Sequence, residues 1–250
     1  MKNTLITCAT SQIGQAIAEK MAPDSKLILT GRNVENLNHI LSSSTMPIAR
    51  CQLDFFDEGS IAACAEQISA CNPVDNLVLI IPRIPASSAI FLDTEQWREL
   101  YDNYFIKPLS LIKALYENNR IATGANLLII SGLSSKSALS HYASNNCLRS
   151  AWLGQAKTMA LAMGEQGISV NTLSLGGVMS DSYIAKMEQK AKQQEIGYDA
   201  LMQQEVSNIP LNKYASLEDV ASTVHSMLGP MANHMTGQNI LLDGGFFRGY

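Results

Sequence analysis

Short apolar runs alternate with longer segments of helical periodicity along the whole chain, and this alternation limits the possible folds more than any other feature. Most of the short runs are apolar at nearly every position, which is typical of strands covered on both faces of a sheet. Strands that are regularly followed by helices predict parallel pairing through helical crossovers. The expected strands are residues 4–7, 26–30, 48–53, 76–81, 126–131, 168–173 and 239–242.

Seven such strands predict an α/β fold, a Rossmann-type doubly wound seven-stranded parallel sheet. No linker-like or low-complexity stretch divides the 250 residues, so a single domain spanning residues 1–250 is expected. Ligands of such a sheet bind beyond the carboxyl ends of its strands. The expected helices are residues 13–21, 34–41, 58–70, 94–117, 142–163, 183–205 and 217–228.

Composition argues against several classes of function. The formal net charge is −4 and the basic residues form no cluster, which disfavours nucleic acid or an anionic membrane as a partner. No apolar run reaches the roughly 18 residues of a membrane span. The cysteines show no Cys-x-x-Cys spacing and the histidines no ligand spacing, so no metal site is expected. A cytoplasmic protein with reduced thiols is the expectation.

Six motifs occur in order along nearly the whole chain. They are residues 7–14, 29–33, 53–54, the pair Trp97 and Asn103, 170–178 and 235–245. Together they resemble the short-chain dehydrogenase/reductase family, in particular its 3-oxoacyl-ACP reductase-like members. The resemblance implies a dinucleotide site at the first motif and a catalytic tyrosine near the start of the helix expected at 142–163.

The dinucleotide loop departs from the family pattern Thr-Gly-x-x-x-Gly-x-Gly, because residues 7–14 read Thr-Cys-Ala-Thr-Ser-Gln-Ile-Gly. The glycines let the turn close, let the backbone approach the pyrophosphate and let helix pack on strand. A side chain at Cys8 is expected to oppose a positive φ angle, and the long Gln12 either obstructs a phosphate or hydrogen-bonds to it. The expected loop contacts of a dinucleotide are Thr7, Gln12, Ile13 and Gly14.

Arg32 follows the second expected strand and indicates which dinucleotide would bind. No acidic residue ends that strand to hold a ribose 2′-hydroxyl, whereas a guanidinium suits a 2′-phosphate. The resemblance adds Asp54 on the adenine side. NADP(H) is therefore expected rather than NAD(H), unless the damaged loop binds no cofactor and Arg32 is only a solvated loop residue.

The family's catalytic residues are only partly present. The family uses a tyrosine acid/base, a lysine four residues later and a serine at a strand end. Tyr142 keeps the tyrosine, but Asn146 replaces the lysine and Gly132 stands at the serine position. On one helix, Tyr142 and Asn146 would share a face. The candidate replacements for the serine are Ser131, Ser134 and Ser135.

The fourth family residue, a helix asparagine, and the missing lysine also lack direct equivalents. Tyr104 stands at the asparagine position, and Asn103 would point about 100° away on a helix. Arg149 lies seven residues after Tyr142 on roughly the same helical face, where its charge would favour an ionised phenol. Because this helix packs between subunits in the family, an interfacial or solvated Arg149 is the preferred interpretation. Lys136 and His141 are further loop alternatives.

Three functions are compatible with these residues. The losses favour a pseudo-reductase that serves as a binding or partner subunit, in a homo-oligomer or with an active relative. The second is an atypical NADP(H)-dependent carbonyl oxidoreductase in which Tyr142 acts with Ser131 and Asn146. The third is non-redox chemistry in the same pocket, such as proton transfer, dehydration or hydrolysis. Residues 179–212 form either a lid over a small hydrophobic or acyl ligand or packed scaffold.

Overall fold

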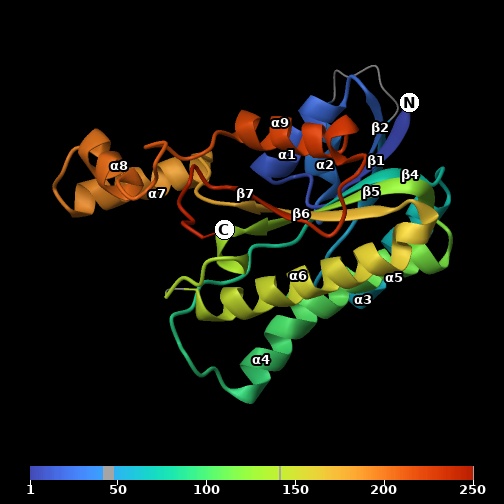
Figure 1. Ribbon diagram of the computed structural model, residues 1–250, viewed down its shortest axis with the longest axis horizontal. Coiled ribbons are helices and arrows are strands. Elements are labelled where there is room, and N and C mark those ends of the chain that lie inside the picture. Colours follow the sequence, from blue (N-terminus) through green and yellow to red (C-terminus); the bar gives the residue numbers. More distant parts are fainter. Residues whose placement is uncertain (42–47, 141, 250) are drawn as a thin grey trace.

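The computed structural model describes residues 1–41, 48–140 and 142–249, and its centre is a parallel sheet between two layers of helices (Figure 1). The strand order is β3-β2-β1-β4-β5-β6-β7, and every neighbouring pair is parallel. The chain reverses its direction across the sheet between β1 and β4, which confirms the predicted doubly wound topology. The strands are β1 (Lys2–Ile6), β2 (Ser25–Gly31), β3 (Ile48–Gln52), β4 (Val74–Ile80), β5 (Ile121–Gly132), β6 (Ser169–Leu175) and β7 (Asn239–Leu242).

Each face of the sheet buries its own apolar core. On one face, the buried side chains of Ile17, Leu37 and Val220 belong to a single cluster. On the other face, Ile61, Leu111 and Trp152 belong to the second. The helices over the first core are α1 (Gln12–Met21), α2 (Val34–His39) and α9 (Leu217–Met227), and those over the second are α3 (Glu58–Ser69), α5 (Lys107–Glu117) and α6 (Ala143–Met163).

The helix expected at residues 94–117 is present and contains a π-helical turn. It consists of α4 (Thr94–Tyr101), a π-helical turn (Asp102–Ile106) and α5, and the N–H of Lys107 donates to the carbonyl of Asp102. The cause lies in Pro108, which has no N–H to donate to the carbonyl four residues earlier, that of Tyr104. The indole Nε1 of Trp152 donates to that carbonyl instead, at 2.8 Å. The predicted helix is confirmed with its bounds, and the pattern missed only the π-helical turn before the proline.

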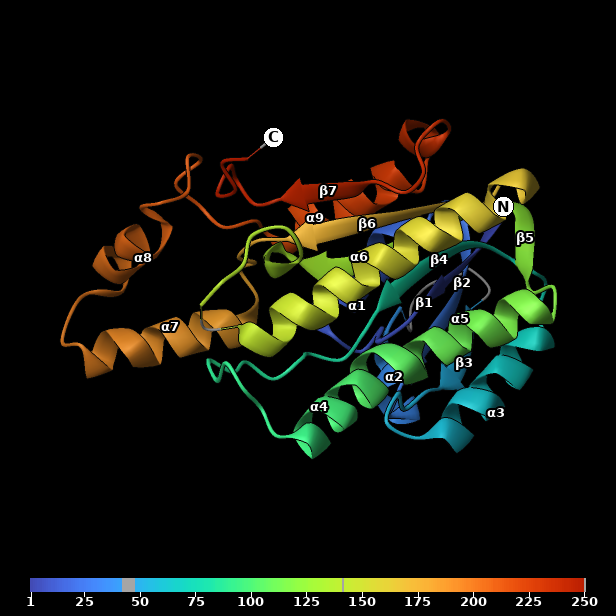
Figure 2. The same ribbon diagram turned by 60° about the horizontal axis from the view of Figure 1, so that its bottom comes forward.

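The helix expected at residues 183–205 is two helices, α7 (Asp181–Gln193) and α8 (Tyr198–Val206). Glu195 between them has a φ of +54°, a left-handed conformation that ends α7. The two helices project from the main body as a hairpin (Figure 2). Their apolar residues form a small separate core, which consists of Met187, Ala191 and Leu201 with Tyr183, Ile196, Tyr198 and Met202 packed against it.

Candidate active site

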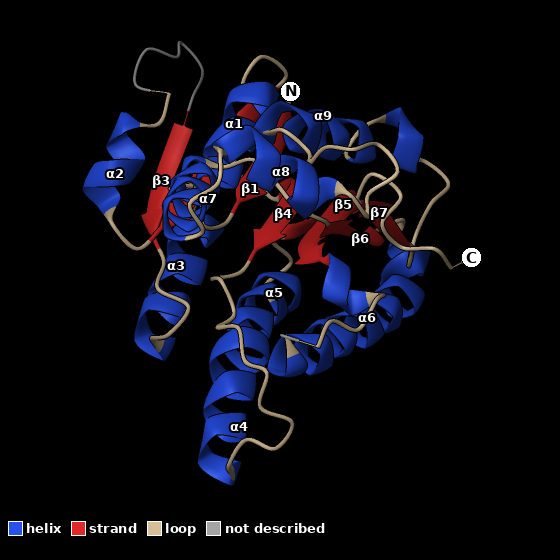
Figure 3. Cartoon of the chain, turned by 90° about the vertical axis from the view of Figure 1, so that its left-hand side faces the viewer, coloured by secondary structure: helices blue, strands red, loops and turns tan. Residues whose placement is uncertain are grey.

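The candidate catalytic residues gather at the carboxyl edge of the sheet, the edge that Figure 3 faces. Gly132 ends β5 there and is buried. A Cβ placed on Gly132 would lie 2.0 Å from Nη1 and 2.4 Å from Cζ of Arg149. The guanidinium of Arg149, carried by α6, therefore occupies the volume in which the family's serine side chain would begin.

Arg149 is partly buried and turned inward. Its Nη1 donates to Oγ of Ser134 at 3.1 Å. Burial lowers the pKa of Arg149; the charge of an ionised Tyr142 would raise it, and the positive charge of Arg83 lowers it further. Arginine stays charged in proteins all the same, so this site holds a cation. This placement differs from a fully solvated Arg149, and the interfacial interpretation stays a prediction.

Tyr142 and Asn146 both lie at the start of α6, where the N–H of Asn146 donates to the carbonyl of Tyr142 at 2.8 Å. Tyr142 is the N-cap of α6, with φ −135° and ψ 42°, and the helix begins at Ala143. The side-chain amide of Asn146 hydrogen-bonds to both backbone groups of Leu139, at 3.2 and 3.1 Å. Asn146 therefore holds the segment before Tyr142 in place, and the prediction that Asn146 stands in for the lysine finds no support in its contacts.

The three candidate serines have different surroundings. Ser134 is the one that contacts Arg149. Ser135 lies 2.7 Å from the hydroxyl of Ser174, and its oxygen also accepts from Nδ2 of Asn239 at 3.3 Å. Ser131 is half-buried and pairs in register with Ser174 across β5 and β6. The structure thus brings Ser134 to the arginine, while Ser135 ties the loop after β5 to the neighbouring strands.

The remaining sequence candidates are engaged elsewhere. Asn103 accepts from Nζ of Lys107 at 3.0 Å. The ring of Tyr104 packs edge-on against Phe56, with centroids 5.5 Å apart, and burial raises the pKa of Tyr104. Nζ of Lys136 lies 5.6 Å from the ring centroid of Phe247, and His141 lies outside the described residues.

The dinucleotide loop keeps its backbone course despite the missing glycines. Cys8 adopts φ +46°, so the side chain that was expected to oppose a positive φ tolerates it. A Cβ on Gly14 would lie 2.6 Å from the carbonyl oxygen of Cys8, so only glycine lets α1 approach β1 this closely. Ser11 caps α1 by accepting from the N–H of Gly14 at 3.1 Å. Thr7 joins the end of β1 to β4 through 2.7 Å bonds with both backbone groups of Ile80.

Gln12 makes the contact that the sequence least suggested. Its Oε1 accepts from the backbone N–H of Asp181 at 2.9 Å, and its Nε2 donates to the Asp181 carboxylate. Asp181 is the first residue of α7. Because β4 and β5 lie between β1 and β6 in the sheet, this contact runs across the carboxyl ends of the central strands. We call it the Gln12–Asp181 bridge.

Arg32 and Asp54 lie on the far side of the same loop. Arg32 is exposed at the end of β2. Burial raises the pKa of the Cys8 thiol to about 12; the charge of Arg32 opposes this effect and that of Asp54 adds to it. The Asp54 carboxylate accepts from the N–H of Phe56 at 3.0 Å, which fixes its own turn. Both charged groups therefore stand near Cys8, where the adenosine end of a dinucleotide is expected.

The backbone at the start of α1 is compatible with dinucleotide binding. N–H groups in the first turn of a helix have no partner in that helix, and Ser11 satisfies only that of Gly14. The start of α1, where Ile13 packs against the core, can therefore bind a pyrophosphate. Gln12 is the first residue of this helix, and Asp181 holds its side chain.

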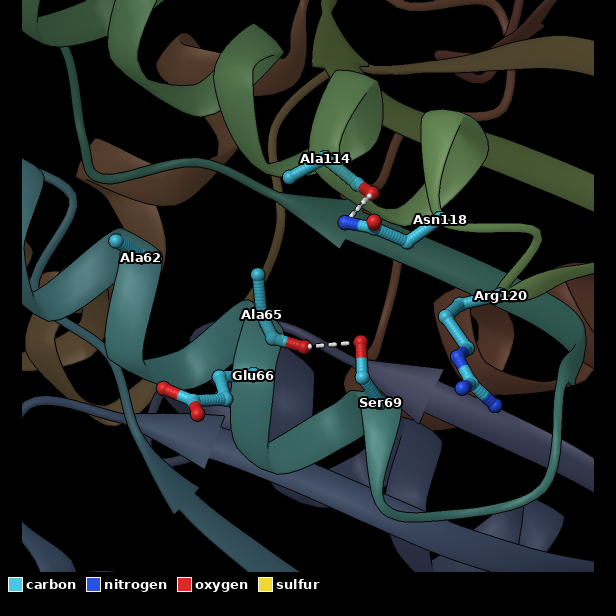
Figure 4. Close-up of a pocket in the computed structure, with 7 residues that line it drawn as sticks. All are labelled: Ala62, Ala65, Glu66, Ser69, Ala114, Asn118 and Arg120. Atoms are coloured by element: carbon cyan, nitrogen blue, oxygen red, sulfur yellow. Dashed lines mark hydrogen bonds between the residues drawn. The ribbon is translucent and has the colours of Figure 1, made fainter.

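Two cavities lie away from this cluster. One of about 440 Å³ lies between α3 and α5 and is lined by Ala62, Ala65, Glu66, Ser69, Ala114, Asn118 and Arg120 (Figure 4). Arg120 immediately precedes β5, so this cavity opens toward the amino edge of the sheet. The other, of about 500 Å³, lies beside α9 and β7. Neither is lined by Tyr142 or Arg149, but the second is lined by Leu242 and Gly244 at the carboxyl end of β7, and doubly wound folds bind their ligands at this edge.

The family is decided by comparison of the whole chain with known proteins. The family model described as enoyl-(acyl carrier protein) reductase matches residues 8–247. The chain belongs to the short-chain dehydrogenase/reductase family. The family predicted from the motifs is thereby confirmed.

Individual members of the family match over nearly their full length. A 3-oxoacyl-[acyl-carrier-protein] reductase of Rickettsia conorii is 28% identical, over 98% of this chain and 96% of its own. An NADPH-dependent reductase of Bacillus subtilis is 24% identical, over 98% and 97%. A short chain oxidoreductase from Pseudomonas aeruginosa PAO1, described as containing an atypical catalytic center, superposes with a TM-score of 0.88 at 19% identity, over 100% and 98%.

Two further expectations concern metals and membranes. Within residues 1–41, 48–140 and 142–249, no group of three or more His, Cys, Asp or Glu side chains is arranged to hold a metal ion. In the same residues, no helix is long and apolar enough to cross a membrane.

Proposed function

We propose that the chain is an NADP(H)-dependent carbonyl oxidoreductase with an arginine-containing catalytic centre. The observation that carries the proposal is the guanidinium of Arg149 in the place of the family's serine side chain. Removing a charge from water is costly unless the charge has a partner. Gly132 leaves the room that the large side chain of Arg149 fills, and this exchange keeps a strong hydrogen-bond donor beside Tyr142. If this centre had no catalytic role, apolar side chains could fill the same space without the free-energy cost of burying a charge.

The cofactor assignment rests on the loop and on Arg32. Gly14 and Ile13 at the start of α1 would hold the pyrophosphate, with Thr7 keeping β1 and β4 in register beneath it. Arg32 would pair with a 2′-phosphate, and Asp54 would stand near the adenine. The name of the Bacillus subtilis relative, an NADPH-dependent reductase, supports the same choice. These residues favour NADP(H) over NAD(H).

The proposed chemistry divides between two side chains. The bound reduced nicotinamide would supply a hydride to the carbonyl carbon of the substrate. As the carbon–oxygen double bond becomes a single bond, its electron pair moves to the oxygen, and Arg149 stabilises that negative charge through its N–H donors. Tyr142 then donates its hydroxyl proton to the oxygen, which yields the alcohol. Ser134 orients the guanidinium by accepting one of its hydrogen bonds.

The pseudo-reductase predicted from the sequence is the second candidate, and the Gln12–Asp181 bridge favours it. If the bridge never opens, the start of α1 stays closed to a pyrophosphate and the fold can serve only as a binding or partner subunit. No contact in the described part of the chain favours the third candidate, non-redox proton transfer, dehydration or hydrolysis, over the other two.

Assembly and location belong to the same proposal. We expect a homo-oligomer, a dimer or tetramer, because the large apolar side chains of Leu161, Leu211 and Met231 are 76%, 64% and 56% exposed. A hetero-oligomer with an active relative is the form that the pseudo-reductase would take. A cytoplasmic location agrees with five free cysteines, and a small molecule remains the proposed ligand, with residues 179–212 as its lid.

Oxidation of NADPH, followed by its absorbance with a panel of ketones and aldehydes, tests the proposal. The wild type is expected to turn over at least one of them. Arg149→Gln should lower kcat/KM by about 100- to 1000-fold, as the loss of a donor to a developing oxyanion does. Tyr142→Phe should lower it by at least about 100-fold. Arg98→Gln changes the same residue type on exposed α4 and should have no effect. NADPH binding without oxidation of any carbonyl, or full activity in Arg149→Gln, would contradict the proposal.

A further inference from the structure

A second arginine, Arg83, follows the carboxyl end of β4, the strand that pairs with β5. Arg83 is exposed and lies between β4 and α4, next to Ile84, which is 4% exposed. Two hydrogen bonds fasten the same segment to the start of α6. The N–H of Ala143 donates to the carbonyl of Ser87 at 2.7 Å, and Nδ2 of Asn145 donates to that of Pro85 at 2.8 Å. Figure 2 shows this segment passing the beginning of α6. Arg83 is thus held on the same side of the molecule as Tyr142 and Arg149.

Neither arginine has an acidic partner. Among the ion pairs of the described residues, none includes Arg83 or Arg149. The hydrogen bond of the Arg149 side chain goes to a neutral hydroxyl, that of Ser134. The two positive charges also repel each other, since Arg83 contributes to the lowered pKa of Arg149. Keeping two positive charges near each other costs free energy, and an anion bound between them would offset that cost.

The start of α6 adds to the positive potential. The helix runs from Ala143 to Met163; the carbonyl of Ser87 accepts from the N–H of Ala143, and no side chain of the described residues caps the first turn. The partial positive charge of a helix N-terminus favours anions. Arg83, Arg149 and the start of α6 therefore all lie at the carboxyl edge of the sheet, where Tyr142 is the N-cap of α6.

We propose that the substrate carries a carboxylate next to its reacting carbonyl group, as a 2-oxo acid does, and that Arg83 and Arg149 bind it at the start of α6. This inference rests on the proposed oxidoreductase function, and it names the substrate class of that site. The planar guanidinium fork matches a carboxylate in two parallel hydrogen bonds. A single negative charge suits the site better than a phosphate, because Arg83 is exposed and only Arg149 is withdrawn from water.

Binding without cofactor tests the anion site independently of catalysis. Phenylpyruvate and phenylacetone share the phenyl group and the ketone, and they differ by the carboxylate. In calorimetric titrations of the wild type we expect phenylpyruvate to bind at least about tenfold more tightly than phenylacetone, and more tightly than inorganic phosphate. Arg83→Gln should remove most of this difference, whereas Arg98→Gln, on exposed α4, should retain it.

A kinetic arm separates the inference from the function on which it rests. With NADPH present, the ratio of kcat/KM for phenylpyruvate to that for phenylacetone is expected to exceed about ten, and Arg83→Gln should lower this ratio about tenfold. Turnover of phenylacetone with no preference for phenylpyruvate would overturn the carboxylate site while the oxidoreductase stands. Tight phenylpyruvate binding that depends on Arg83, without any NADPH oxidation, would support the anion site and remove the oxidoreductase. Equal binding of phosphate and phenylpyruvate would overturn the choice of a carboxylate.

Discussion

The role of a glycine in this protein depends on which atoms lie close to its Cα. Gly132 leaves room for the guanidinium of Arg149. Gly14 leaves room for the carbonyl oxygen of Cys8, which would be only 2.6 Å from a Cβ at position 14. Gly154 in the middle of α6, by contrast, has no atom within 4 Å of where a Cβ would be. The same residue type therefore serves close packing in the first two positions and has no packing role in the third.

Alanine at these positions should change stability in opposite directions. We expect Gly14→Ala to lower the free energy of unfolding by at least about 2 kcal/mol, because the backbone of α1 has to move away from β1. Gly154→Ala should raise it by about 0.5–1 kcal/mol, since alanine is the better helix former and meets nothing. Denaturant unfolding of both variants measures this difference. A Gly14→Ala variant as stable as the wild type would show that the loop is not so tightly packed.

Cys8 should be unreactive at neutral pH. Burial raises the pKa of its thiol to about 12, so the nucleophilic thiolate is scarce below that pH. Alkylation by iodoacetamide at pH 8, mapped by mass spectrometry, is expected to modify the exposed Cys147 long before Cys8. The sign for stability follows from the raised pKa. The neutral thiol contributes fully below the unfolded value of about 8.5, and the contribution falls as pH rises toward 12. Equal labelling of both cysteines at pH 8 would contradict this account.

At the scale of elements, two contacts join segments that are far apart in the chain. The Gln12–Asp181 bridge ties the start of α1 to the start of α7 across 169 residues. The indole of Trp152 on α6 satisfies the carbonyl of Tyr104 that Pro108 leaves without a donor. We expect the first contact to control access to the dinucleotide loop and the second to support the π-helical turn between α4 and α5.

Opening the bridge should make cofactor binding easier. Gln12→Gly removes the side chain that the bridge holds at the start of α1, and it restores the glycine of the family pattern. We expect it to increase NADPH affinity by about tenfold, which corresponds to about 1.4 kcal/mol. Asp181→Ala, which removes the carboxylate but keeps the bond from the backbone N–H of residue 181 to Gln12, should produce a smaller gain. Calorimetric titration measures both, and a weaker affinity in Gln12→Gly would show that the glutamine assists the phosphate, the other role predicted for it.

The two tryptophans offer a matched pair for the π-helical turn. Trp152→Phe leaves the Tyr104 carbonyl without its donor and should cost about 1–3 kcal/mol of unfolding free energy, plus the lost packing of a fully buried ring. Trp97→Phe, on half-exposed α4, should cost much less. Urea unfolding compares them, and equal losses would mean that the indole hydrogen bond contributes little.

At the scale of the whole molecule, the sequence predicted the sheet better than the site. All seven strands follow apolar runs, because both faces of a parallel sheet are buried and leave a continuous signal. The π-helical turn before Pro108 and the helix boundary near Glu195 were missed, since periodicity does not register a single interruption. The placement of Arg149 was missed for another reason. Helical spacing indicates which face the residue shares with Tyr142, but only the fold shows that Gly132 stands opposite. Asp181 had no signal at all.

The hairpin of α7 and α8 should behave as a separate unit of stability. Leu201 is 1% exposed but packs within the hairpin's own small core, whereas Leu128 is 1% exposed in the core beneath the sheet. We expect Leu201→Ala to accelerate amide hydrogen exchange in residues 181–206 and to leave the strands unaffected. Leu128→Ala should lower global stability by about 2–5 kcal/mol and accelerate exchange throughout the chain. Uniform acceleration in Leu201→Ala would show that the hairpin is continuous with the main core.

Titration of the purified protein with NADPH and with NADH, followed by calorimetry, tests the oxidoreductase account most directly. We predict that NADPH binds, that NADH binds at least about tenfold more weakly, and that Arg32→Gln removes the difference. Absence of binding heat for both dinucleotides at millimolar concentration would contradict the account. The Gln12–Asp181 bridge would then be a permanent closure, and the pseudo-reductase would be the better description of the protein.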